Sequence, residues 1–249
     1  MDKGFLDYDE KLEKLKKMIR DSNSIVCMLG IGMGMECGLA NRWSNEEAYR
    51  VEKEYKYSPE EIYSTVFYNT RPELFFKYYR NECLKLDCEP SVAYDALKRL
   101  ESTGKLTACI THNIQSMAVK AGLKNVIELH GTIHDNRCPK CDRRYTAEYM
   151  KKSVGVPHCE ICKAPIRPMI KLQGEMIRND RMTEAANVCA QADMIMVLGT
   201  NLFHPMVSTF TNYYKGNRIV LVSKNEHFTD KKADLCIHDE VKTILPLVM

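Results

Sequence analysis

The chain has 249 residues, of which 45% are hydrophobic, and a net charge of +3. This length predicts one large domain, or a core domain with a small insert, with enough apolar residues for a packed core. The charge is too small to indicate a nucleic-acid partner by itself. No stretch approaches the roughly 18 consecutive apolar residues of a membrane-spanning helix, so no membrane partner is expected.

Four of the 11 cysteines form two Cys-x-x-Cys pairs, Cys138/Cys141 and Cys159/Cys162, with 17 residues between the pairs. This spacing is typical of a structural zinc site. Four thiolates complete a tetrahedron around the ion and leave no open position, so the metal would hold structure rather than perform chemistry.

The other seven cysteines fall mostly inside predicted strands and helices, and we interpret them as buried free thiols. They are Cys27, Cys37, Cys83, Cys88, Cys109, Cys189 and Cys236. Unpaired thiols in this number indicate a reducing compartment, the cytoplasm.

The first predicted elements are a helix over 8–20 and a strand over 24–29. The strand lacks polar alternation, as expected for a parallel sheet covered on both faces. It runs into a glycine-rich loop, Gly30-Ile31-Gly32-Met33-Gly34. Such a loop lets backbone N–H groups approach a phosphate at a helix N-terminus, although a glycine-rich turn in any packed α/β domain gives the same pattern.

Residues 45–89 are rich in Glu, Lys and Tyr, and their periodicity predicts an inserted helical module with helices over 46–55, 59–68 and 71–86. A helix over 91–103 follows, with Ser91 as its cap and Gly104 as its stop. The charged residues of the module are most simply a solvated face.

A buried strand over 106–110 ends in Thr111-His112-Asn113-Ile114-Gln115. Polar groups at the carboxyl end of a strand lie where ligands bind in open α/β sheets. A short helix over 115–121 then leads to a strand over 126–129, which ends at His130. A lone histidine is more often structural than catalytic, so its role must come from the rest of the chain.

After the cysteines, strands are predicted over 166–172, 194–198, 218–223 and 235–238. Helices are predicted over 181–191 and from about 239. Alternating strands and helices around two inserts predict an α/β fold with a doubly wound parallel sheet and a second, smaller domain.

Six motifs in this order resemble the sirtuin family, over nearly all of the chain after residue 24. They are Gly30-x-Gly32, Thr111-x-Asn113-Ile114, Glu128-Leu129-His130-Gly131, the paired Cys-x-x-Cys, Gly174-Glu175 and Gly199-Thr200-x-Leu202. The resemblance implies a Rossmann-like NAD-binding domain over 1–44, 90–134 and 168–249. It also implies a small domain made of the helical module over 45–89 and the zinc ribbon over 135–167.

Sirtuins use NAD to remove acyl groups from lysine, so the resemblance implies an acylated protein substrate and release of nicotinamide and O-acyl-ADP-ribose. Carried onto this chain, it makes His130 the general base and Asn113 the residue that orders the ribose side. The cofactor-binding residues that it implies are Gly30, Ile31, Gly32, Glu36, Arg42, Trp43, Asn113, Ile114, Gln115, Gly199, Thr200, Asn201, Ser223 and Asn225. The implied metal ligands are Cys138, Cys141, Cys159 and Cys162.

Two of the chain's departures from the family pattern lie in the cofactor-binding segments. The loop that usually reads Gly-Ile-Pro-Asp-Phe-Arg is here Gly38-Leu39-Ala40-Asn41-Arg42-Trp43, so the arginine and the aromatic exchange order. The family's Thr-Gln-Asn-Ile-Asp is here Thr111-His112-Asn113-Ile114-Gln115, so the last residue can accept a hydrogen bond but carries no charge.

Two alternatives to a lysine deacylase stay open at this point: a sirtuin-like protein ADP-ribosyltransferase, and a non-catalytic NAD-binding or zinc-ribbon module. The presence of His130 favours the deacylase. The basic pairs Arg143-Arg144 and Lys151-Lys152 are interpreted as solvated, so no nucleic-acid partner is expected.

A last hypothesis concerns the acyl group. Lys171 and Gln173 would share one face of a strand, because strand side chains repeat with period two. If that face lines the acyl-lysine tunnel, its ammonium favours an acyl group that ends in a carboxylate. The alternative is that Ile170 and Leu172 line the tunnel instead.

Overall fold

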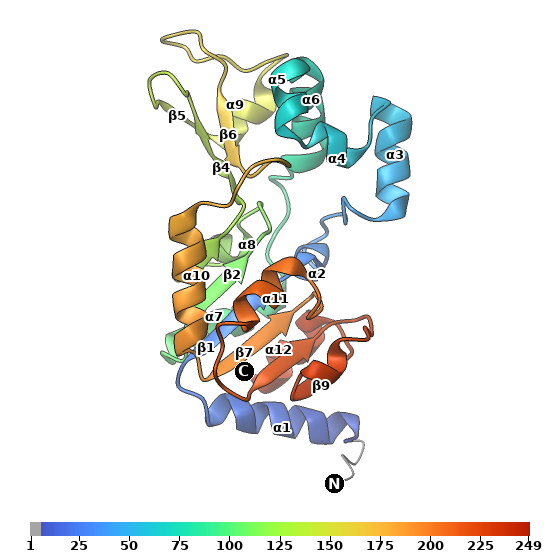
Figure 1. The fold of residues 1–249 in the computed structure, drawn as a ribbon, viewed down its shortest axis with the longest axis vertical. Coiled ribbons are helices and arrows are strands. Elements are labelled where there is room, and N and C mark those ends of the chain that lie inside the picture. Colours follow the sequence, from blue (N-terminus) through green and yellow to red (C-terminus); the bar gives the residue numbers. More distant parts are fainter. Residues whose placement is uncertain (1–5) are drawn as a thin grey trace.

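This computed structural model describes residues 6–249, so residues 1–5, which the sequence assigns to the larger domain, lie outside the described part. Its main sheet has six strands in the order β3-β2-β1-β7-β8-β9 (Figure 1). The strands are β1 (Ile25–Leu29), β2 (Leu106–Thr111), β3 (Val126–Glu128), β7 (Met194–Leu198), β8 (Ile219–Val222) and β9 (Leu235–Ile237). All neighbours are parallel, and this is the Rossmann strand order, which confirms the predicted fold class.

Helices cover both faces of this sheet. Side chains alternate along β1, so Ile25, Cys27 and Leu29 enter one core and Val26 and Met28 the other. The helices that pack into the first core are α1 (Tyr8–Arg20), α7 (Val92–Ser102) and α12 (Val241–Val248); those in the second are α10 (Asn179–Gln191) and α11 (Pro205–Thr211). No helix among residues 6–249 is long and apolar enough to cross a bilayer.

A second, antiparallel sheet lies above the first in Figure 1, next to a group of helices. Its strands, in the order β5-β4-β6, are β4 (Gly131–Arg137), β5 (Arg144–Tyr145) and β6 (Arg167–Ile170). The helices are α3 (Asn45–Tyr55), α4 (Pro59–Ile62), α5 (Thr65–Thr70), α6 (Pro72–Tyr78), the π-helical turn η1 (Tyr79–Cys83) and α9 (Ala147–Lys152). They share one apolar core with the ribbon, which includes Phe75, Ile133 and Met150.

Three short elements complete the chain, and each follows or precedes a strand of the main sheet. They are α2 (Ile31–Met35), α8 (Met117–Lys120) and the 3₁₀ turn η2 (Asp230–Lys232).

The main difference between the helical module and its prediction is a broken helix. The helix predicted over 59–68 is broken into α4 and α5, because the Ser64 hydroxyl accepts a 3.2 Å hydrogen bond from the Phe67 N–H and starts a new helix there. The backbone of Gln173 bonds to both sides of the break. The Gln173 N–H donates to the Tyr63 carbonyl, and the Gln173 carbonyl accepts from the Thr65 N–H. Packing of a distant segment thus decides the break.

Other element boundaries also differ. The helix predicted over 71–86 ends at Cys83, and the short helix predicted over 115–121 covers only Met117–Lys120. The Ser91 hydroxyl, expected to cap α7, has no hydrogen-bond partner within the described residues 6–249.

Candidate active site

Two glycine-containing loops meet where the order of the main sheet reverses, between β1 and β7. The Gly30 N–H donates to the Leu198 carbonyl and the Gly32 N–H to the Gly199 carbonyl, both at 2.8 Å. A Cβ on Gly30 would lie 2.3 Å from Thr200 Cβ, and one on Gly32 would lie 2.7 Å from the Gly199 oxygen, so only glycine permits this approach. The loop glycines thus stand at the switch point, where open α/β sheets bind their ligands.

Asn113 ties the end of β2 to the same loop. Its side-chain amide donates a 2.8 Å hydrogen bond to the Gly30 carbonyl. Its own N–H donates to the Thr111 hydroxyl at 3.0 Å, and that hydroxyl donates to the Leu29 carbonyl at 3.2 Å. The orientation of Asn113 is therefore fixed by the carboxyl ends of β1 and β2.

His130 follows β3 and is held by backbone bonds on either side. The Leu129 N–H donates to the Thr111 carbonyl, and the Lys171 N–H donates to the His130 carbonyl, both at 2.9 Å. Burial, helped by the nearby Lys171 and His204, lowers the pKa of His130 to about 4. The imidazole is therefore neutral near pH 7 and can accept a proton.

Three histidines gather at this edge of the sheet. The His130 ring meets the edge of His112 at a centroid distance of 5.8 Å, and His112 stacks on His204 at 4.6 Å with an interplanar angle of 16°. Burial, together with the other two imidazoles, lowers the pKa of His112 to about 3. The Nδ1 atom of His112 is buried and has no hydrogen-bond partner among residues 6–249.

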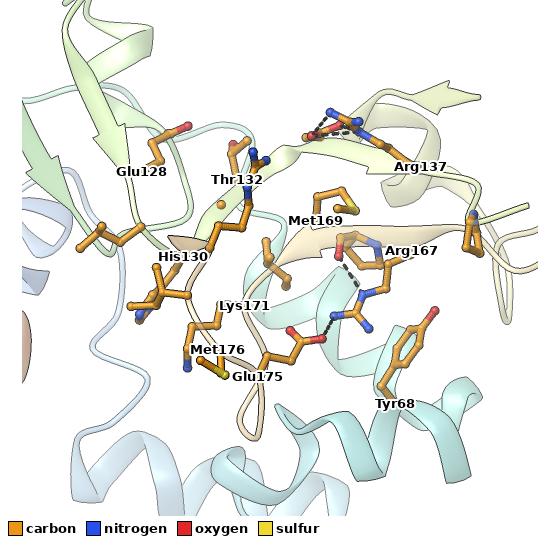
Figure 2. A pocket seen from close by; sticks show the side chains of 18 of the residues that line it. Tyr68, Glu128, His130, Thr132, Arg137, Arg167, Met169, Lys171, Glu175 and Met176 are labelled. Atoms are coloured by element: carbon orange, nitrogen blue, oxygen red, sulfur yellow. Dashed lines mark hydrogen bonds and ion pairs between the residues drawn. The ribbon is translucent and has the colours of Figure 1, made fainter. Parts of the chain in front are cut away.

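A cavity of about 940 Å³ opens beside His130 and extends along β4 and β6 (Figure 2). Lys171 and Ile170 line it, whereas Gln173 and Leu172 do not. β6 ends at Ile170, and of the pair Lys171 and Gln173, which were expected to line the acyl-lysine tunnel together, only Lys171 lines this cavity. Among residues 6–249 Lys171 has no ion-pair partner, in contrast to Arg167, which pairs with Glu175.

Arg42 and Trp43 lie against the helical module. The Arg42 guanidinium donates to the Cys83 sulfur at 3.0 Å and lies 5.1 Å above the Tyr63 ring. The Trp43 ring meets the same tyrosine edge-on at 6.0 Å. Arg42 and the buried Gln115 line a separate cavity of about 240 Å³.

Ile114 and Glu36 are engaged in packing and capping. Ile114 is 1% exposed, and its carbonyl accepts from Ile133. The Glu36 carboxylate accepts from the backbone N–H groups of Val241 at 2.6 Å and Lys242 at 2.9 Å, so it caps α12. The structure thus gives this carboxylate a structural role.

The remaining predicted cofactor residues follow β7 and β8 at the same edge. The Asn201 side chain accepts from the N–H groups of Phe203 at 3.0 Å and His204 at 2.9 Å, which shapes the turn after β7. Ser223 follows β8 and donates from its N–H to the Ile237 carbonyl, and Asn225 is exposed two residues later.

The four cysteines of the ribbon converge, with all four sulfur atoms within 4.8 Å of one another. The sulfurs of Cys138 and Cys162 are 3.2 Å apart, and Cys141 lies 3.6 Å from Cys159 and 3.7 Å from Cys162. With Zn–S bonds of about 2.3 Å, the edge of a tetrahedron is about 3.8 Å. The donor set and its size therefore fit a zinc ion.

Comparison with known proteins agrees with this geometry. Residues 30–204 match the model of the Sir2 family, SIR2. The chain is 33% identical to the NAD-dependent protein deacetylase of Clostridium acetobutylicum over 96% of this chain and 98% of that one. The chain belongs to the Sir2 family, the sirtuins.

Solved structures of Sir2 proteins share the whole fold. A complex of Sir2 with a peptide and NAD+ superposes with a TM-score of 0.82 at 28% identity, covering 96% of this chain and 97% of that one. Sir2 bound to an acetylated peptide gives 0.79 at 26% identity, with the same coverage.

His204 is a site residue that the sequence analysis missed. It lies 74 positions beyond His130 in the chain, and only folding brings it to His112 and His130. A usable signal was present, since His112, His130 and His204 each follow a predicted strand within a few residues, and such positions gather at one edge of a parallel sheet.

Proposed function

We propose that this protein is an NAD-dependent protein lysine deacylase that releases nicotinamide and O-acyl-ADP-ribose. One observation carries the proposal: Asn113 is bonded to the glycine loop at the switch point, while a neutral histidine stands at the end of the adjacent strand. Membership of the Sir2 family supplies the reaction class, and relatives that match over nearly their full length are NAD-dependent protein deacetylases.

We propose the following roles for the chain's own residues. NAD supplies the ribose carbon that takes the acyl oxygen when nicotinamide leaves. Gly30 and Gly32 admit the phosphates, and Asn113 orders the ribose side because its amide is fixed by the Gly30 carbonyl. His130 removes a proton from a ribose hydroxyl, for which its unprotonated state at neutral pH is required.

The remaining predicted assignments are proposed on the same grounds. The substrate is an acylated protein or peptide segment, and the wide cavity beside His130 is the space for its acyl-lysine. The zinc held by the four ribbon cysteines is structural, because its ligand set leaves no open position. None of the 11 cysteines forms a disulfide, which supports the cytoplasm as the compartment.

The test is a product analysis by mass spectrometry after incubation of the protein with NAD and a panel of acylated lysine peptides. A deacylase yields nicotinamide, free lysine peptide and O-acyl-ADP-ribose in equal amounts. Nicotinamide together with an ADP-ribosylated peptide would identify a transferase, and absence of nicotinamide with every peptide would contradict an enzymatic role.

A further inference from the structure

A second group of metal-ligand side chains lies at β9, the edge strand of the main sheet, apart from the zinc ribbon. Ligand atoms of Asp230, Cys236 and His238 all lie within 4.8 Å of one another. Leu235 and Ile237 point into the core of the sheet, so Cys236 occupies the opposite face of β9, and His238 follows it by one strand period. Asp230 comes from η2, in the connection between β8 and β9.

The distances match the edges of a metal tetrahedron. His238 Nε2 lies 3.4 Å from Asp230 Oδ2 and 3.6 Å from Cys236 Sγ. With zinc bonds of about 2.0 Å to nitrogen and oxygen and about 2.3 Å to sulfur, tetrahedral edges are about 3.3 Å for N–O and about 3.5 Å for N–S. One ion placed between the three atoms would satisfy both separations.

A hydrogen bond at the other ring nitrogen leaves His238 Nε2 as the atom that can bind a cation. His238 Nδ1 lies 3.3 Å from the Ser223 carbonyl, and a carbonyl can only accept, so Nδ1 carries the proton. Nε2 then faces the Asp230 carboxylate oxygen and the Cys236 sulfur, the position from which it can bind a cation. A backbone carbonyl behind the other ring nitrogen is also the usual support of a metal-bound histidine.

The Asp230 carboxylate gives a second indication of a bound ion. Its Oδ2 accepts a 2.7 Å hydrogen bond from the His227 N–H, which orients the carboxylate. Its Oδ1 is buried and has no hydrogen-bond partner among residues 6–249. A buried carboxylate oxygen without a protein partner calls for water or an ion.

We propose that Asp230, Cys236 and His238 form a second metal site for a divalent transition ion of the zinc class. Nitrogen, sulfur and oxygen ligands together favour zinc over magnesium or calcium, which take oxygen ligands. The Cys236 thiol gives up its proton to solvent when it binds, and a water molecule completes the four-coordinate shell. The ion fastens η2 to β9 and so closes the connection between β8 and β9.

The competing explanation is a metal-free ion pair, in which a protonated His238 binds Asp230 and the Cys236 thiol rests beside the ring. The two explanations differ in zinc stoichiometry. The experiment is native mass spectrometry of the full chain titrated with up to two equivalents of zinc, for wild type, Cys236→Ala, His238→Gln and the control Cys88→Ala. Cys88 is a half-buried thiol outside both clusters.

We expect two zinc ions per chain in wild type and Cys88→Ala, and one in Cys236→Ala and His238→Gln. One zinc per chain in wild type, or a second zinc retained by both site variants, would overturn the proposal. A second measurement uses the wild type alone and so does not depend on the folding of variants. The second equivalent of zinc should slow the alkylation of Cys236 by iodoacetamide at least tenfold and leave the alkylation rate of Cys88 unchanged. Equal alkylation of Cys236 with one and two equivalents would also overturn it.

Discussion

The side-chain amide of Asn113 donates a 2.8 Å hydrogen bond to the carbonyl oxygen of Gly30, which joins the ends of two adjacent strands of the main sheet. Because this carbonyl belongs to the glycine loop, the bond couples the proposed ribose-ordering residue to the proposed phosphate loop.

The first prediction tests this coupling with Asn113→Asp, which keeps the size of the side chain but replaces the donor by a carboxylate facing a carbonyl. Loss of the bond and the new repulsion should weaken NAD binding at least tenfold and destabilise the fold by about 1–3 kcal/mol. Isothermal titration with NAD and thermal melting measure both effects. The exposed Asn217→Asp is the matched control, and equal NAD affinity in the two variants would contradict the coupling.

The second prediction concerns the zinc ribbon. Cys159→Ala removes a buried ligand, so the ribbon should lose its metal and the melting temperature should fall by several degrees, because zinc binding and folding of such ribbons are linked. Metal analysis and thermal melting are compared with those of Cys88→Ala. The account fails if Cys159→Ala loses no zinc relative to that control and melts as the wild type does.

The third prediction is that the folded protein loses stability at acid pH. The pKa values of His112 and His130 are depressed in the folded state to about 3 and about 4, mainly by burial, whereas both residues titrate near 6.5 when unfolded. Below pH 6.5 the unfolded chain therefore binds more protons than the folded chain. The free energy of unfolding is highest above that pH, where both rings are neutral in either state, and it decreases as the pH falls. Each ring accounts for at most about 2 kcal/mol between pH 7 and pH 5.

This lability is measured as the melting temperature at pH 7 and pH 5 for wild type and His112→Gln. The variant should show a clearly smaller drop, because glutamine does not titrate. The exposed His134→Gln is the control, and identical drops in wild type and His112→Gln would show that His112 is not a buried neutral ring.

The fourth prediction concerns the acyl group. Lys171 lies beside His130 in the cavity, and its ammonium has no ion-pair partner among residues 6–249, so a carboxylate at the end of a substrate acyl chain could bind it. Succinyl-lysine peptide should exceed acetyl-lysine peptide in kcat/KM, and Lys171→Met should lower that ratio about tenfold or more. The exposed Lys163→Met is the control, and an unchanged ratio in Lys171→Met would rule out this role.

The sequence predicted those parts of the fold that have a local physical cause. The strand over Ile25–Leu29 was visible because burial on both faces requires a continuous apolar run. The ribbon was visible because tetrahedral zinc constrains the spacing of Cys138, Cys141, Cys159 and Cys162, whose sulfurs do converge. Glycine at 30 and 32 reflects the close approach of a second loop, although the sequence does not say which loop.

What the sequence did not predict depends on residues distant in the chain. Glu36 caps a helix 205 residues away, and the break between α4 and α5 is fixed by the backbone of Gln173. The stacking of His112 on His204 likewise has no local pattern. The end of β6 at Ile170 also follows from tertiary context, since Lys171 and Leu172 fit a strand by sequence alone.

The most direct test of the central claim is the comparison of His130→Ala with His134→Ala, a histidine exposed on β4 just beyond the site. NAD affinity by isothermal titration and deacylation of an acyl-lysine peptide are measured for both variants and for wild type. We predict that His130→Ala binds NAD with an affinity close to that of wild type but turns over at least about 10²-fold more slowly, while His134→Ala matches wild type in both. Deacylation by His130→Ala at the wild-type rate would contradict the account.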